Sequence, residues 1–201
     1  MSSHTVRTEE TDSLLWRQVK EGSESALGRL VHRYANALQN YGYKFVPDTD
    51  FVKDCVQEVF IEVWSRRQAL AHPDSVRAYL LSSVRKRVLR QGFRQQIMRN
   101  DVPADLDDYA GFVEFSPEWL LIEQESVAEK AQRVATLLNQ LPKRQREVVY
   151  LRFYQGLERD EIAQIMGVAP QSVSNLIQST FKTFRELWTG TVFVWLCLNI
   201  C

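Results

Sequence analysis

Four residues that begin or end helices divide the stretch 138–188 into three short helices. In chain order they are Pro142, Gly156, Gly167 and Pro170. The first proline can open a helix, because the first helical position needs no N–H, and the first glycine can close it in a left-handed cap. A second helix is predicted over 159–166, then a three-residue turn and a third helix that begins at the second proline. This order is the pattern of a helix-turn-helix DNA-binding motif.

Apolar residues recur at helical spacing in the second and third predicted helices, so each has a face to bury. They are Ile162, Ala163, Ile165 and Met166 in the second helix, and Val173, Leu176, Ile177, Phe181 and Phe184 in the third. The other face of the third helix carries short amide and hydroxyl groups, which can reach base edges. These predicted DNA-binding residues are Gln171, Ser172, Ser174, Asn175 and Gln178. The alternative is a small helical bundle with no nucleic-acid partner, but a merely solvated face usually carries more charge.

The composition indicates an all-α protein of one or two small domains. The chain has 201 residues, 45% of them hydrophobic, with little glycine or proline and with apolar residues at helical spacing almost throughout. The cysteines are too few and too unevenly spread for a disulfide framework, and no secretory signal opens the chain. We therefore expect a cytoplasmic protein. The cysteines are Cys55, Cys197 and Cys201.

The sequence offers no constellation of catalytic or metal-binding residues. The histidines His4, His32 and His72 lie far apart, and no nucleophile stands beside a base. The two C-terminal cysteines are one helical turn apart but have no histidine pair near them. We expect no catalytic residue, no metal and no cofactor, so an enzyme is the least favoured class.

The charges cancel to a net charge of zero, yet they are sorted into blocks. The stretch 77–100 contains no acidic residue, and it predicts a helix with a phosphate-binding stripe, unless the stripe is only a solvated face. Its basic residues are Arg77, Arg85, Lys86, Arg87, Arg90, Arg94 and Arg99. The stretch 101–129 contains nine acidic residues and no basic one, which indicates an acidic linker or a disordered spacer.

The N-terminal part predicts three further helices and a docking surface. Asp12 or Ser13 can cap the first helix, Ser23 the second, and Asp48 or Asp50 the third. The inner face of the third helix is formed by Val52, Val56, Val59, Phe60 and Val63. A mixture of carboxylate, amide and large apolar groups lies toward its other sides, which is typical of a docking surface. These residues are Asp54, Gln57, Glu58, Ile61 and Trp64.

Two of these segments resemble one known family. The sequence DCVQEVFIEVW is very similar to the region 2.2 signature of bacterial sigma factors of the extracytoplasmic-function (ECF) group, within the sigma-70 family. The sequence LPKRQREVVYLRFYQGLERDEIAQIMGV resembles region 4 of the same proteins. The resemblance extends from about Leu14 to Trp188. It implies two helical domains, over 1–98 and 118–201, joined by an acidic linker over 99–117.

The resemblance also implies partners for each segment. In the family, the region 2.2 helix binds the clamp helices of core RNA polymerase, so the docking surface above would bind polymerase. The segment 65–75 matches the loop that captures a flipped-out base of the minus-ten element, and the basic stripe matches the part that contacts that strand. The linker matches a segment threaded toward the polymerase active-site cleft. The third helix of the C-terminal motif would read the minus-thirty-five element, with Lys182 added to its DNA-binding residues.

The chain departs from the family pattern in its DNA-binding helices. Lys86 and Arg90 stand where relatives commonly have asparagine and aspartate, so the usual minus-ten preference is not carried over. Ala169 replaces a capping serine or threonine, a loss of about 1 kcal/mol. The third helix also has few basic residues, which predicts weak attraction to phosphates. Asn175 and Gln178 can still pair with adenine edges.

The C-terminal segment 191–201 is almost wholly apolar. It is too short to span a bilayer, which needs about 20 such residues, so no membrane insertion is expected. One interpretation is that it extends the last helix and packs on its own domain. The other is that it docks an inhibitory protein (an anti-sigma factor) or an accessory targeting protein.

The sequence therefore predicts an ECF-type sigma factor that binds core RNA polymerase, recognises and helps melt promoter DNA, and directs transcription initiation. One alternative is a free-standing helix-turn-helix regulator, which would have no use for the surface on the third helix. Another is a sigma factor that needs an accessory DNA-targeting partner.

Overall fold

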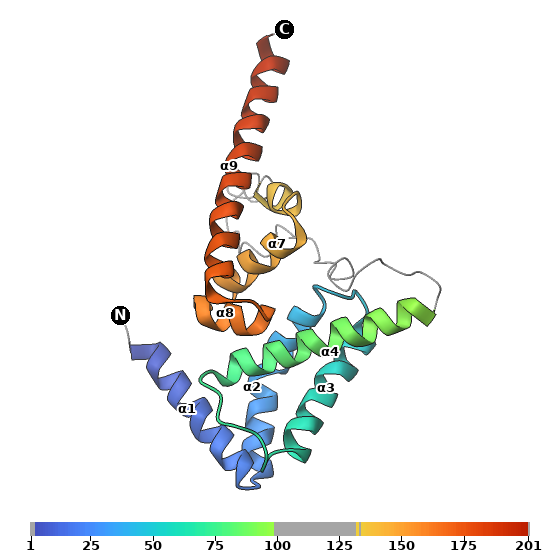
Figure 1. Cartoon of the computed structure of the whole chain (residues 1–201), viewed down its shortest axis with the longest axis vertical. Helices are drawn as coiled ribbons and strands as arrows, with labels where there is room; N and C mark the ends of the chain where they lie inside the picture. The colour runs from blue at the N-terminus through green and yellow to red at the C-terminus, as the bar shows by residue number, and fades with distance from the viewer. Residues whose placement is uncertain (1–2, 99–131, 133, 201) are drawn as a thin grey trace. The chain divides into compact units, whose positions relative to one another are not determined.

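The fold is that of a computed structural model, which describes residues 3–98, 132 and 134–200, and the side chains of 12–94, 132 and 134–187. All regular secondary structure within these ranges is helical (Figure 1), which confirms the predicted fold class. The chain divides into two compact units. The helices of the first unit are α1 (Ser3–Lys20), α2 (Glu24–Gly42), α3 (Thr49–Ser65) and α4 (Val76–Met98).

Three side-chain caps fix where the helices of the first unit begin. The hydroxyl of Ser23 accepts from the amide of Ala26 at the start of α2. Asp48, rather than Asp50, caps α3 and accepts two backbone N–H groups at 3.1 Å. Ser75 caps α4 in the same way, at 3.2 Å. Each cap satisfies a donor that the first helical turn leaves unpaired.

The predicted start of the first helix was wrong. Helix α1 begins at Ser3, and Asp12 lies within it. The Asp12 carboxylate is buried, and it accepts from the Arg33 guanidinium and the Tyr34 hydroxyl of α2. A carboxylate in the middle of a helix finds no free N–H, so it pairs with the facing helix instead. Burial of the Tyr34 phenol, followed by its bond to Asp12, raises the pKa of Tyr34.

The core of the first unit forms where α3 and α4 pack against α2. All five residues of the predicted inner face of α3 are buried, as expected. From α4, Leu80, Val84, Val88 and Leu89 fill the same core. Each fully buried side chain of this size contributes about 1.5–3 kcal/mol. The helix order and spacing are visible in Figure 1.

The second unit is built on α7 (Lys143–Val149), the π-helix η2 (Tyr150–Tyr154), α8 (Arg159–Met166) and α9 (Pro170–Ile200). Pro142 precedes the first helical residue instead of occupying that position. The backbone φ of Gly156 is +64°, the left-handed conformation predicted for it, and that of Gly167, in the predicted turn, is +68°. Helix α8 covers the predicted 159–166, and its predicted apolar residues are buried. The helix-turn-helix pattern is thus present.

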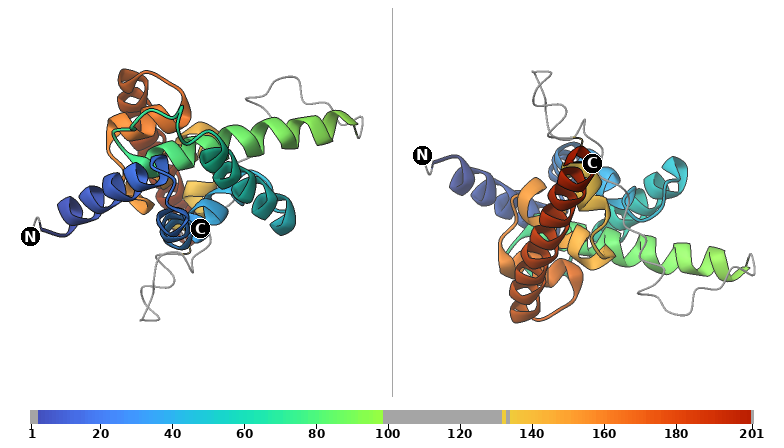
Figure 2. Two further views of the ribbon diagram at one scale, coloured as in Figure 1. Left: turned by 90° about the horizontal axis from the view of Figure 1, so that it is seen from below. Right: turned by 90° about the horizontal axis from the view of Figure 1, so that it is seen from above.

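Two sequence expectations concern the chain's C-terminal part and its linker. Helix α9 runs without a break to Ile200 (Figures 1 and 2), so the backbone of the apolar segment extends the last helix as one interpretation required. Within the described residues, no helix is long and apolar enough to cross a membrane. The acidic linker over 99–117, together with Arg99, lies outside the described residues.

The last residue of α2, Gly42, marks the closest approach of three helices. A Cβ atom built on Gly42 would lie 2.6 Å from Cγ1 of Val52 in α3 and 3.6 Å from Cγ2 of Val88 in α4. Both valines are fully buried, and a β-branched side chain in a helix has essentially one rotamer. The contact therefore has little room to relax.

We expect Gly42→Ala to destabilise the protein by about 1–3 kcal/mol, the usual cost of overpacking a core. Gly28→Ala in the same helix is the matched control, because Gly28 is exposed and nothing lies within 4 Å of the added Cβ. This control should stabilise the helix by roughly 0.5–1 kcal/mol. Urea unfolding of both variants measures the difference, and equal effects would contradict the tight contact.

Candidate nucleic-acid interface

The predicted docking residues form one stripe along α3, opposite its buried valines. Asp54, Gln57 and Glu58 are exposed, Ile61 is 63% exposed, and Trp64 is half-buried. The stripe follows from helical periodicity, because residues three and four apart share a face. The structure therefore brings these five residues together on one accessible surface.

An ion-pair network joins this stripe to α4. The Arg87 guanidinium binds Glu58 at 2.5 Å through one nitrogen and Glu62 at 2.5 Å through the other. The Gln91 amide also donates to Glu58, at 2.8 Å, and Arg66 pairs with Glu62 at 3.0 Å. Only 16% of the Arg87 side chain is exposed. Arg87, predicted to contact DNA, thus binds two carboxylates of its own chain.

The network lowers the pKa values of both glutamates. For Glu58 the hydrogen bond from Gln91 has the largest effect, followed by that from Arg87. For Glu62 the bond from Arg66 comes first. Glu62 was not among the site residues predicted from the sequence. Its spacing of four residues from Glu58 and from Arg66 nevertheless predicts that the three side chains share one helical face. That spacing was the available signal.

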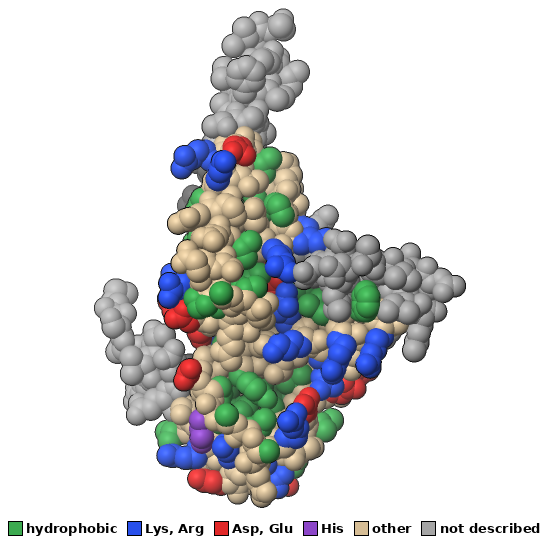
Figure 3. All heavy atoms as spheres, viewed as in Figure 1, with side chains coloured by type: hydrophobic (Ala, Val, Ile, Leu, Met, Phe, Trp, Pro, Cys, Tyr) green, Lys and Arg blue, Asp and Glu red, His purple; other side chains and the backbone are tan. Residues whose placement is uncertain are grey.

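The other basic residues of α4 differ in their environment. Lys86, Arg90 and Arg94 are exposed, whereas Arg77 and Arg85 are partly buried. The Arg85 guanidinium lies 5.8 Å from the ring centre of Phe45. Figure 3 shows basic side chains gathered along the surface over α4. The phosphate-binding stripe stays a prediction, and three exposed cations of α4 belong to it.

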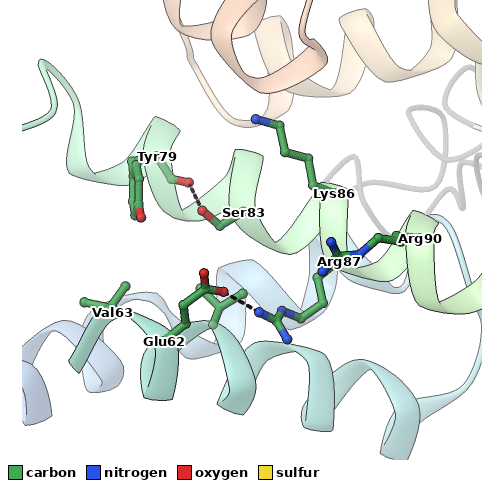
Figure 4. Close-up of a pocket in the computed structure, with 8 residues that line it drawn as sticks. Glu62, Val63, Tyr79, Ser83, Lys86, Arg87 and Arg90 are labelled. Atoms are coloured by element: carbon green, nitrogen blue, oxygen red, sulfur yellow. Dashed lines mark hydrogen bonds and ion pairs between the residues drawn. The ribbon is translucent and has the colours of Figure 1, made fainter. Parts of the chain in front are cut away.

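A groove of about 240 Å³ separates α3 from α4 (Figure 4). Lys86, Arg87 and Arg90 line the groove from α4, and Glu62 lines it from α3. In Figure 4 the Arg87 side chain reaches toward Glu62, to which it is bound, whereas the Lys86 side chain points away from α3. Burial raises the pKa of the Tyr79 phenol, so this ring is uncharged at neutral pH. The lining residues are Val59, Glu62, Val63, Tyr79, Ser83, Lys86, Arg87 and Arg90.

In the second unit, the predicted base-contacting residues lie on the accessible face of α9. Gln171, Asn175, Gln178 and Lys182 are exposed, and the two serines between them are partly buried. The Gln171 amide donates to the Asn175 side-chain oxygen at 3.1 Å. Amide groups one helical turn apart are thus already oriented by each other. Val173, on the opposite face, is fully buried.

Phe181 does not join the core as its spacing suggested. It is 55% exposed and meets Phe153 of η2 edge-on, with ring centres 6.2 Å apart. The two rings border an apolar groove of about 250 Å³, which sequence analysis did not predict. The π-turn that places Phe153 has no clear sequence signature. The groove is lined by Val134, Leu138, Val148, Val149, Phe153, Ile177, Thr180, Phe181 and Phe184.

The described residues contain no group of three or more histidine, cysteine or carboxylate side chains that could hold a metal ion.

Comparison with known families shows which family the chain belongs to. Residues 30–96 match the family model described as sigma-70 region 2, and residues 131–183 match the model described as sigma-70, region 4. The two models occur in the order that the sequence predicted and together cover well over half of the chain. The chain belongs to the sigma-70 family. It is a sigma factor that directs transcription initiation, and the family consists of DNA-binding initiation factors rather than enzymes.

Individual relatives support the ECF group. The chain is 28% identical to RNA polymerase sigma factor CnrH of Cupriavidus metallidurans, over 86% of this chain and 91% of that protein. It is also 28% identical to the ECF RNA polymerase sigma-E factor of Escherichia coli, over 83% and 88%. Among solved structures, CnrH in complex with the cytosolic domain of CnrY matches with a TM-score of 0.57 and 23% identity, covering 90% of this chain and 98% of CnrH. That likeness supports the fold.

We expect Arg87→Ala to lower stability by roughly 0.5–1 kcal/mol at neutral pH, because both carboxylates are nearly half exposed and water screens the pairs. The lowered pKa values mean that the network stabilises the fold above the ordinary glutamate pKa of 4.5. This stability is lost as the pH falls through the lower folded values. The variant should lose part of that acid dependence, as measured by urea unfolding between pH 3 and 7.

Arg90→Ala is the control for this measurement, since Arg90 is exposed on the same helix. Its acid dependence should match that of the unaltered protein. An unchanged acid profile in Arg87→Ala would show that the ion pairs do not contribute in solution.

Proposed function

We propose that this sigma factor reads promoters in two parts, with each unit carrying one contact to DNA. The N-terminal domain, over 1–98, binds core RNA polymerase and the melted minus-ten strand. The C-terminal domain, over 118–201, reads the minus-thirty-five duplex, and the acidic linker over 99–117 enters the polymerase. The observation that carries the proposal is the α3 stripe, which stays exposed while the opposite face is buried.

The α3 stripe is the proposed polymerase-binding surface. It combines carboxylates with Ile61 and the ring of Trp64, and interfaces draw most of their binding energy from such large groups surrounded by polar ones. A free-standing regulator has no need of this surface, and the match to region 2 favours the sigma factor over that alternative. Glu58 would meet the partner while held in place by Arg87 and Gln91.

The groove between α3 and α4 is the proposed path of the nontemplate strand. Lys86 and Arg90 would attract its phosphates, and Arg77, Arg85 and Arg94 would extend the basic surface along α4. Arg87 acts mainly as the support that holds Glu58 and Glu62. Unstacking a base costs a few kcal/mol, and contacts with the loop over 65–75 and with the groove offset this cost.

Helix α9 is the proposed reader of duplex DNA. Its amides and hydroxyls can hydrogen-bond base edges in the major groove, while Lys182 is an exposed cation beside them. Among the described residues, the exposed cations of α9 are Lys182 and Arg185. Because two cations supply little phosphate attraction, the duplex contact depends on the bases and on tethering through the polymerase. An accessory DNA-targeting partner is the second candidate for the missing affinity.

The apolar groove of the second unit is the proposed docking site for an apolar segment of a partner protein. An exposed phenylalanine pair beside a concave apolar surface is a poor contact for water. The sigma factor RpoE of Bartonella quintana was solved in complex with the anti-sigma factor NepR, and CnrH with the cytosolic domain of CnrY. By analogy, we assign an anti-sigma factor as a partner of this chain. We further propose that this sigma factor is cytoplasmic and has no catalytic residues or cofactor of its own.

The polymerase contact is tested by the double substitution Asp54→Ala with Trp64→Ala. We expect the affinity for core RNA polymerase to fall by about 2–4 kcal/mol, roughly 30-fold or more, because both charge and aromatic area are lost. Asn36→Ala is the control, since Asn36 is exposed on α2 and is not part of the α3 stripe. Binding would be measured by fluorescence anisotropy, after thermal unfolding has shown that the variants fold. Wild-type affinity in the double variant would refute the assigned surface.

Promoter recognition is tested by selection from a random promoter library with core polymerase. The unaltered chain should enrich paired elements, and failure to enrich any would favour the accessory partner.

Asn175→Ala should relax the preference at one base position of the upstream element, at a cost of about 1–3 kcal/mol. Lys182→Ala should instead weaken all sequences equally and reduce the salt dependence by about one phosphate contact. Unchanged base preferences in Asn175→Ala would remove α9 as the reader.

A further inference from the structure

The connection between α3 and α4, residues 66–75, is fixed at both of its ends. At its start, the Arg67 guanidinium lies 4.3 Å from the ring centre of Trp64 and donates to the Trp64 carbonyl at 2.9 Å. A turn follows, in which the amides of Ala69 and Leu70 bind the Arg66 carbonyl. At its end, Ser75 caps α4. The ends therefore belong to the helices that they join.

The middle of this loop is held by a helix from elsewhere in the sequence. The indole N–H of Trp16, in α1, donates to the carbonyl of Ala71 at 3.1 Å. Among the described residues, this is the sole hydrogen bond made by 71–74. Trp16 is only 1% exposed, whereas Ala71, His72 and Asp74 are exposed. A buried anchor thus fixes an accessible segment at one backbone atom.

The same indole also contacts the groove between α3 and α4. Its ring meets that of Tyr79 edge-on, with ring centres 5.1 Å apart and planes at 69°. Tyr79 lines the groove proposed for the nontemplate strand. Trp16 therefore touches the loop through a hydrogen bond and the groove wall through a ring contact. A buried indole N–H needs an acceptor, and here that acceptor is a backbone carbonyl of the loop.

We infer that Trp16 is a positioning residue for promoter-strand capture, and that α1 acts as part of the strand-binding apparatus. The inference rests on the proposed function of the loop and the groove. Residue 16 lies outside the residues 30–96 that match region 2, so the family match does not assign it this role. A loop held in its binding conformation loses less conformational freedom when the strand arrives. The anchor thus raises strand affinity without touching DNA.

The test compares three variants of the full chain. Trp16→Phe removes the N–H donor and keeps an aromatic ring. Val19→Ala is the control for stability. Val19 is as deeply buried in α1 as Trp16, but none of its hydrogen bonds joins it to the loop. Gln68→Ala with His72→Ala alters two exposed loop side chains and reports whether the loop binds the strand at all.

Two measurements separate positioning from simple destabilisation. Hydrogen–deuterium exchange of the free chain measures how fast the backbone amides of 66–75 exchange, separately from those of the helices. Fluorescence anisotropy of a labelled single-stranded DNA measures the affinity of the complex with core polymerase for the strand. The DNA has the nontemplate-strand sequence of a promoter selected by the unaltered chain. Affinity for core polymerase itself is measured alongside.

Trp16→Phe should speed exchange in 66–75 and weaken strand binding by roughly three- to tenfold, the effect of losing one hydrogen bond. Its affinity for core polymerase should stay unchanged. Val19→Ala should leave both the loop exchange and the strand affinity as in the unaltered chain. If Trp16→Phe behaves like Val19→Ala while the loop variant weakens strand binding, the inference is overturned and the loop's proposed function stands. If the loop variant also binds the strand normally, both are overturned.

Discussion

The buried apolar face of α3 is the constraint on which the rest of the first unit depends. This face is formed by Val52, Val56, Val59, Phe60 and Val63. Five apolar residues at helical spacing must be buried, and burying them against α2 and α4 fixes the rotation of α3 about its own axis. Once that rotation is fixed, Asp54, Ile61 and their neighbours have to face solvent. The surface proposed for polymerase is therefore a consequence of core packing, and Gly42, which has no Cβ, allows the helices to approach this closely.

The electrostatics of the unit add a compromise to this packing. Placing α4 beside α3 brings a basic helix against two glutamates, and Arg87 forms an ion pair with each of them. This arginine is then less available to phosphates, because breaking two charge-assisted bonds opposes any new contact. In return, Glu58 and Glu62 are held by groups from α3 and α4. The proposed partner-binding and strand-binding surfaces thus share one set of ion pairs.

The features that sequence analysis predicted are those that local chemistry determines. Gly167 follows the last residue of α8 and Pro170 begins α9, and periodicity determines which face of α3 is buried, so both could be predicted. The misses depend on what packs opposite. Asp12 suggested a helix cap until α2 supplied Arg33 and Tyr34, and Arg87 suggested a phosphate ligand until α3 supplied two carboxylates. Phe181 suggested core because its spacing could not reveal that the π-turn brings Phe153 beside it at the surface.

The distribution of accessible cations explains why two DNA contacts would be needed. Helix α4 exposes Lys86, Arg90 and Arg94, whereas the described part of α9 exposes Lys182 and Arg185. Affinity for DNA rises with the number of phosphates neutralised, so α9 alone would bind duplex weakly at physiological salt. Joining the two contacts through one chain on one polymerase makes the second contact intramolecular, and its effective concentration replaces the missing charge. A weakly basic reader then contributes selectivity among sequences, because base-edge hydrogen bonds, unlike phosphate contacts, distinguish one promoter from another.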